Sequence, residues 1–120
     1  TWLLSFCSVM ASAALAAPIQ GPARVIDGDT IQIGSERVRI EGIDAPESAQ
    51  TCRDGRDRTW ACGQAALRRL RELVAGEPVT CQGGQRDDYG RLIGTCRARG
   101  RDLGGTLVSE GRAWAFVKYS

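Results

Sequence analysis

Two short acidic segments of the sequence have the residue types and spacing that could bind a cation. The first is Asp27-Gly28-Asp29-Thr30, and the second is Asp44-Ala45-Pro46-Glu47, at the end of an expected apolar strand. Taken alone, Asp-Gly is a good turn sequence, and carboxylates beside a proline are equally typical of a solvated loop. Their combination indicates more. If the first and third strands are neighbours, Asp29 and Asp44 meet, and two nearby carboxylates favour a hard, oxygen-seeking cation such as Ca²⁺.

Arginines supply the complementary charge. Lys118 is the sole lysine among 16 basic residues, and the other side chains are guanidinium groups, whose planar donors bind phosphate or carboxylate in a bidentate manner. A GC-rich genome is the alternative explanation for most of these arginines. Two of them stand near the acidic segments or a turn: Arg39 precedes Asp44 by five residues, and Arg91 closes the segment Tyr89-Gly90-Arg91.

The composition restricts the mechanisms that these residues could serve. The chain has 120 residues, 42% hydrophobic and 25% charged, which is typical of one soluble globular domain. It has no histidine, so an imidazole base, proton shuttle or metal ligand is excluded. The net charge of +2 is too small to indicate a nucleic-acid or membrane surface by itself. Nothing in the sequence indicates more than a monomer.

The first residues have the composition of a secretory signal. Residues 2–17 are apolar or small and uncharged, but the stretch is shorter than the about 20 residues that a spanning helix needs. Ala14-Leu15-Ala16 gives the small-x-small cleavage pattern. We therefore expect a signal peptide at 1–16 that lacks its charged n-region, and a single secreted or periplasmic domain at 17–120 that is free of the membrane after cleavage. A buried or anchoring helix is the alternative.

Export would place the cysteines in an oxidising compartment. Four cysteines follow the expected signal: Cys52, Cys62, Cys81 and Cys96. Three pairings are possible. We favour two local bridges, Cys52–Cys62 and Cys81–Cys96, because Cys81 and Cys96 end candidate neighbouring strands. A zinc site is the alternative, but the sequence has neither a C-x2-C pair nor a histidine to support it.

The hydrophobic pattern predicts the elements that must position these side chains. Strands are expected at 25–26, 30–33, 37–43, 79–81 and 92–98. The first three form a meander, and a long loop over 44–62 leads to an amphipathic helix over 63–75. A polar loop joins the last two strands, and a short helix over 103–111 precedes an extended stretch. The expected fold class is mainly β (α+β), a five-stranded, partly open barrel of the OB-fold type with one main helix after the third strand and a short second helix.

In order and spacing these segments resemble the staphylococcal (micrococcal) nuclease-like family. The resemblance runs from about residue 24 to 119 and rests on segments 25–30, 37–47 and 88–91, while Trp60-Ala61-Cys62-Gly63 resembles exported bacterial members. It implies a Ca²⁺-dependent nuclease that hydrolyses phosphodiester bonds of DNA and RNA without sugar specificity, prefers single-stranded or denatured substrate and leaves 3′-phosphates. Members generally continue with another helix on the barrel, so we expect this chain to lack its C-terminal helix.

The resemblance also implies a set of metal ligands. Asp29 and Asp44 match the family's calcium-binding carboxylates, and the backbone carbonyl of Ala45 matches a further ligand. Many members have threonine at the position of Ala45. Alanine removes a hydroxyl group and leaves the carbonyl, so we expect metal binding to survive.

The remaining roles concern water and substrate. Glu47 matches the glutamate that acts as general base on the attacking water or orients it. Arg39 and Arg91 match the arginines that hold the scissile phosphate. Tyr89 matches a binding tyrosine of the family, and we expect Tyr89 and Tyr119 to stack on or hydrogen-bond to a nucleotide, with ordinary barrel packing as the alternative.

The second functional hypothesis is a non-catalytic module that binds nucleic acid or another partner on the same barrel. Such a module is expected to lose some acidic or arginine positions. All five are present here, namely Asp29, Arg39, Asp44, Glu47 and Arg91. Their presence favours the enzyme.

Overall fold

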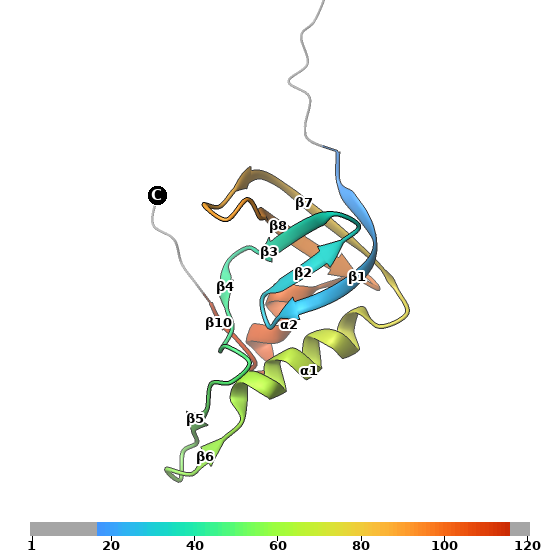
Figure 1. Ribbon diagram of the computed structural model, residues 1–120. Helices are drawn as coiled ribbons and strands as arrows, with labels where there is room; N and C mark the ends of the chain where they lie inside the picture. The colour runs from blue at the N-terminus through green and yellow to red at the C-terminus, as the bar shows by residue number, and fades with distance from the viewer. Residues whose placement is uncertain (1–16, 116–120) are drawn as a thin grey trace, which may run out of the picture.

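The computed structural model describes residues 17–115, and five strands in it close into a barrel (Figure 1). The barrel strands are β1 (Ile19–Asp27), β2 (Thr30–Ile33), β3 (Glu36–Ile40), β7 (Pro78–Arg86) and β8 (Leu92–Ala98). Their order is β3-β2-β1-β7-β8, with antiparallel neighbours, and a parallel pairing of β3 with β8 closes the ring. The OB-type fold class is confirmed, but the barrel is closed and not partly open.

The apolar residues of the strands alternate as the sequence pattern predicts. In β8, every second residue from Leu92 to Ala98 is buried. In β3, Val38 and Ile40 point into the core while Arg39 between them is only partly buried. Because side chains on a strand alternate between its two faces, Arg39 lies on the outer face of the barrel wall.

Two helices cover the barrel. α1 (Cys62–Val74) follows β3 after the long connection, and α2 (Leu103–Ser109) follows β8. The apolar face of α1 buries Ala66 and Leu70 against the strands, and the helix ends before Gly76, which has a φ of 71°. The main helix after the third barrel strand and the short second helix are therefore both confirmed.

The expected strand over 37–43 is wrong in one respect, because it is interrupted after Ile40. Gly42 adopts a φ of 80°, and the chain turns there to form β4 (Ile43–Asp44), which pairs with β10 (Trp114–Ala115) instead of the barrel. β7 also runs to Arg86, so the polar loop before β8 is shorter than expected.

The long connection over 44–62 contains a small hairpin that periodicity did not predict. Its strands are β5 (Cys52–Arg53) and β6 (Thr59–Trp60), and they extend away from the barrel (Figure 1). A further short strand, β9 (Arg101–Asp102), pairs with β8.

The favoured cysteine pairing is confirmed. Cys52–Cys62 joins the hairpin to the first residue of α1, and Cys81–Cys96 joins neighbouring strands of the barrel wall. The expected signal peptide at 1–16 and Tyr119 lie outside the described residues. Between residues 17 and 115, neither helix has the length and apolar character needed to cross a membrane.

Candidate active site

Asp29, Arg39 and Asp44 meet at one end of the barrel. Arg39 lies beside Thr30 in the β2–β3 pairing, and Asp29 directly precedes β2. Arg39 Nη2 is 3.5 Å from Asp29 Oδ2 and 3.5 Å from Asp44 Oδ1. The turn after Ile40 thus brings the carboxylate of β4 to the same guanidinium group as the carboxylate of the β1–β2 turn.

The two carboxylates differ in how firmly they are held. The Asp29 side chain is 13% exposed, and it accepts hydrogen bonds from the Thr30 hydroxyl at 3.1 Å and the Ala45 backbone N–H at 3.3 Å. The Asp44 side chain is 60% exposed. Asp29 is therefore held by hydrogen bonds within the fold, whereas the Asp44 carboxylate is open to solvent.

Ala45 is buried against Gly28 and the first half of α1. A Cβ added at Gly28 would lie 2.9 Å from the Ala45 Cβ and 3.2 Å from the Ala66 Cβ. Three small residues therefore allow the β1–β2 turn, the segment after β4 and α1 to approach closely. Within this packing, the alanine side chain fills the space available at position 45.

Arg91 is fixed by contacts on both sides of its guanidinium group. Its Nε donates to Asp87 Oδ2 at 2.6 Å, and its Nη1 donates to the Thr30 hydroxyl oxygen at 3.0 Å. The Thr30 hydroxyl in turn donates to Asp29 Oδ1. Buried Thr30 is therefore the link that holds the second arginine beside the carboxylate and arginine cluster.

Asp87 organises the turn that presents Arg91. Burial raises the pKa of the Asp87 carboxyl, but hydrogen bonds from the backbone N–H and side chain of Arg91 and from the Tyr89 N–H outweigh burial and lower the pKa below its ordinary value. Asp87 is therefore charged at neutral pH and holds Arg91 through a charge-assisted hydrogen bond.

Tyr89 projects from the same turn into solvent. It is 85% exposed, and the Arg91 guanidinium carbon lies 5.4 Å from the centroid of its ring. Arg37, Tyr89 and Arg91 line a shallow hollow of about 250 Å³. The exposure of Tyr89 argues against the alternative that its ring is part of the barrel packing.

Glu47 is anchored through its backbone, and its side chain is exposed. The Glu47 N–H donates to Gln50 Oε1 at 3.2 Å, and its carbonyl accepts from the Gln50 N–H at 2.8 Å. A Cβ at Gly63, in the first turn of α1, would lie 1.8 Å from the Glu47 carbonyl oxygen. The helix start therefore packs directly on this loop. The structure brings the side chains of Asp29, Arg39 and Asp44 together. Glu47 is linked to this cluster along the chain, three residues after Asp44.

The donors present fit a cation that keeps part of its water shell. Between residues 17 and 115 there is no group of three or more His, Cys, Asp or Glu side chains that could hold a metal ion. The carboxylates of Asp29 and Asp44 both face Arg39 Nη2, and Ca²⁺ can complete its six to eight oxygen ligands with backbone carbonyls and water. An oxygen-only, two-carboxylate set therefore fits calcium better than zinc.

Sequence reasoning missed three residues that build this site. Thr30 links Asp29 to Arg91, Asp87 holds Arg91, and Gly63 lets α1 approach Glu47. Asp87 could have been found from its spacing, because an aspartate at the start of a turn can accept a hydrogen bond from the backbone N–H two residues later, here that of Tyr89. The tertiary contacts of Thr30 and Gly63 left no comparable sequence signal.

The chain is thus a small β-barrel protein, with a closed mixed barrel that gathers two carboxylates and two arginines at one end. Comparison with known families gives the particular class. Residues 37–120 match the model of the family described as "Staphylococcal nuclease homologue". The chain belongs to this family.

Several curated proteins are similar to this chain. A succinoglycan biosynthesis protein, ExoI, of Rhizobium meliloti (strain 1021) is 46% identical over 84% of this chain. A protein named micrococcal nuclease from Shigella flexneri is 35% identical over 80% of it, and an uncharacterized endonuclease of Escherichia coli O157:H7 is 36% identical over 88% of it. The chain spans 54% of the Rhizobium protein, 57% of the Shigella protein and 67% of the Escherichia protein.

Proposed function

We propose that this chain is a Ca²⁺-dependent nuclease that hydrolyses phosphodiester bonds of DNA and RNA without sugar specificity and leaves 3′-phosphates. The observation that carries the proposal is the arrangement in which one guanidinium group, that of Arg39, faces both Asp29 and Asp44, while Thr30 ties Arg91 to the same cluster. Family membership and the names of the relatives support it. We further propose that the enzyme acts as a monomer in the periplasm or outside the cell.

The arginines are suited to the charge that the reaction develops. Attack on a phosphodiester builds negative charge on its nonbridging oxygens, and fixed donors aimed at that charge stabilise the transition state. Arg91 is held by Asp87 and Thr30 before any substrate binds. The single positive charge of Arg39 offsets only part of the charge of the two carboxylates, and a bound cation and phosphate would take over these contacts.

The carboxylates divide into a metal-binding pair and a residue that acts on water. Asp29, Asp44 and the Ala45 carbonyl would hold Ca²⁺, which supplies charge stabilisation at the phosphate and acidifies a bound water. Glu47 accepts the proton of the attacking water or orients it. The backbone of Glu47 is anchored to Gln50, and its side chain is exposed, which leaves room for substrate beside the carboxylate.

The test is digestion of heat-denatured DNA by the oxidised chain, with Ca²⁺ or with a chelator, beside a Glu47→Gln variant. We expect Ca²⁺-dependent cleavage that falls about 100-fold or more in the variant, because a positioned base contributes about 10²–10⁴-fold. Glu77→Gln is the control, since Glu77 pairs with Arg99 after α1 and away from the site. RNA as substrate and end-group analysis of the products test sugar specificity and the 3′-phosphate.

The outcome that would overturn the proposal is equally clear. A folded chain that binds DNA with a steep salt dependence but cuts nothing with Ca²⁺ would be a binding module on the same barrel. Near-full turnover in Glu47→Gln would remove Glu47 from the mechanism while leaving the nuclease intact.

A further inference from the structure

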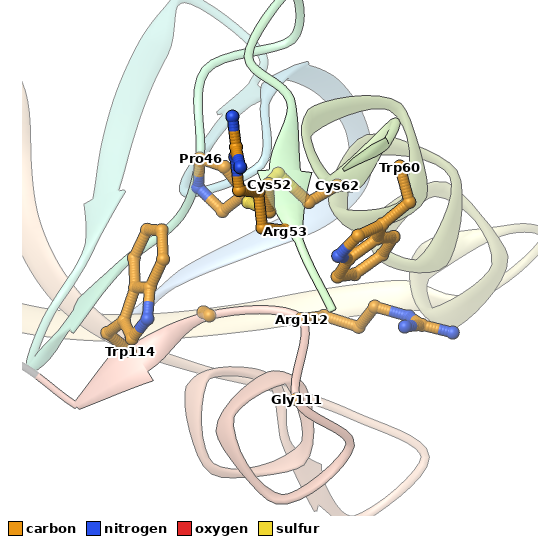
Figure 2. A pocket seen from close by; sticks show the side chains of 9 residues that line it. Pro46, Cys52, Arg53, Trp60, Cys62, Gly111, Arg112 and Trp114 are labelled. Carbon is orange, nitrogen blue, oxygen red and sulfur yellow. A yellow bond between two sulfur atoms is a disulfide. The ribbon is translucent and has the colours of Figure 1, made fainter. Parts of the chain in front are cut away.

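Beside the candidate site lies a cavity that has no part in the proposed catalytic roles. It has a volume of about 240 Å³ and lies between the β5–β6 hairpin and the segment that leads from α2 into β10. Figure 2 shows Trp60 and Trp114 on opposite sides of it, with Pro46 and the Cys52–Cys62 disulfide between them. The hairpin and the chain after α2 are thus both needed to form the cavity.

Two residues that line the cavity adjoin the proposed metal and water residues in the strand pairing or along the chain. Trp114 is the pairing partner of Asp44 in the β4–β10 ladder, and directly paired residues of antiparallel strands have side chains on the same face, about 4.5–5.5 Å apart at Cβ. Pro46, which lines the cavity, stands between Ala45 and Glu47. The cavity wall therefore begins one residue from Glu47 in the chain and at the strand partner of Asp44.

The lining combines aromatic faces with positive charge. The Trp114 residue is 52% exposed, and the Arg112 guanidinium carbon lies 5.9 Å from the centroid of the Trp60 ring. Arg53 adds a second, largely exposed guanidinium group at the rim, where it pairs with Asp57 at 2.8 Å. Trp60 is half-buried, so Trp114 is the exposed face on which a base of any sequence could stack, and the nearby arginines attract phosphates.

We propose that this cavity is a base-stacking subsite for the nucleotide next to the scissile phosphate. Its volume is below the about 300–1,000 Å³ of pockets for drug-sized ligands, which limits the occupant to about one planar ring system. A base stacked here cannot be paired, so the subsite selects single-stranded or locally unpaired nucleic acid. The proposal rests on the proposed function for the position of the phosphate.

The test compares the binding of single strands with and without bases. Dye-labelled oligothymidylate, an abasic oligomer of equal length and a duplex are titrated with the chain in a Glu47→Gln background with Ca²⁺, so that binding is measured by fluorescence anisotropy without cleavage. We expect Trp60→Ala and Trp114→Ala each to raise the Kd for oligothymidylate about tenfold, with little change for the abasic oligomer or the duplex. Arg56→Gln is the control, because Arg56 lies on the same hairpin outside the cavity lining.

Two further variants separate stacking from loss of folding. Trp114→Phe keeps an aromatic face and should retain most of the affinity, whereas Trp114→Leu keeps only apolar volume and should lose it; circular dichroism checks that both fold. An equal loss of affinity for oligothymidylate and the abasic oligomer, or no loss for either, would overturn the subsite. The cavity would then be a candidate site for a protein segment. If the parent chain binds as expected but never cleaves, the proposed function fails while the subsite stands.

Discussion

Asp87 is the residue whose charge holds Arg91 at the site. Its folded-state pKa is lowered because hydrogen bonds from Arg91 and Tyr89 outweigh the effect of burial. The unfolded chain, with an ordinary value of 3.8, therefore binds the proton more readily than the folded chain. The stabilisation is fully present above pH 3.8 and is lost as the pH falls through the lowered folded-state pKa.

An Asp87→Asn variant tests this contribution. We expect it to be less stable than the unsubstituted chain at neutral pH, with a difference that narrows below pH 3.8 and disappears at lower pH, when both side chains are neutral. Urea unfolding at a series of pH values measures the difference. Asp88→Asn, at the exposed neighbouring position, serves as the control, and a difference that stays constant with pH would contradict the assignment.

At the same scale, the sequence allowed the charged residues of the site to be predicted but not the contacts that hold them. Asp29 and Asp44 stand in short turn motifs, and Arg39 has a fixed spacing from Asp44. Thr30 stands in the same motif as Asp29, but the motif does not reveal that its hydroxyl accepts from Arg91, 61 residues away. Which donor meets which acceptor over that separation depends on strand register, and periodicity alone does not determine it.

At the scale of elements, the central strands and both helices were predictable because their apolar residues follow periods of two or of about 3.6. The errors arose where one residue redirects the chain. Gly42, with its φ of 80°, follows the end of β3 within the expected strand over 37–43 and turns Asp44 towards Arg39. The β5–β6 hairpin depends on the Cys52–Cys62 bridge and on two-residue strands, which are too short to give a periodic signal.

The junction of α1 with the Glu47 loop gives a prediction at this scale. Gly63→Ala would place a Cβ 1.8 Å from the Glu47 carbonyl oxygen, so the helix start or the loop must move. We expect a loss of stability of about 1–3 kcal/mol and a fall in kcat about tenfold or greater, because Glu47 is displaced. Thermal unfolding and initial rates on denatured DNA measure the two effects.

Gly55→Ala is the matched control for this change. Gly55 lies in the hairpin with no atom within 4 Å of an added Cβ, so its replacement should leave both quantities nearly unchanged. If Gly63→Ala were as stable and as active as the control, the close approach of α1 would have no role in positioning Glu47.

At the scale of the whole molecule, we expect the two disulfides to contribute similarly to stability but differently to activity. Cys81–Cys96 joins two buried residues of the barrel wall, whereas Cys52–Cys62 joins the exposed hairpin to the start of α1. With sequence separations of 15 and 10 residues, each bridge constrains the unfolded chain by a similar amount, about 3 kcal/mol. Removing either one should therefore cost a similar part of the stability.

Their effects on catalysis should differ, because only one of them is next to the site. A Cys52→Ser/Cys62→Ser double variant frees the hairpin, the wall of the Trp60 cavity and the helix start that packs on Glu47. We expect its kcat/KM on denatured DNA to fall about tenfold or more at a temperature where it is fully folded. Cys81→Ala/Cys96→Ala should unfold at a similarly reduced urea concentration and yet keep most of its kcat/KM. Equal activity of the two double variants, measured at equal folded fractions, would show that the hairpin contributes to stability alone and does not position the Glu47 loop.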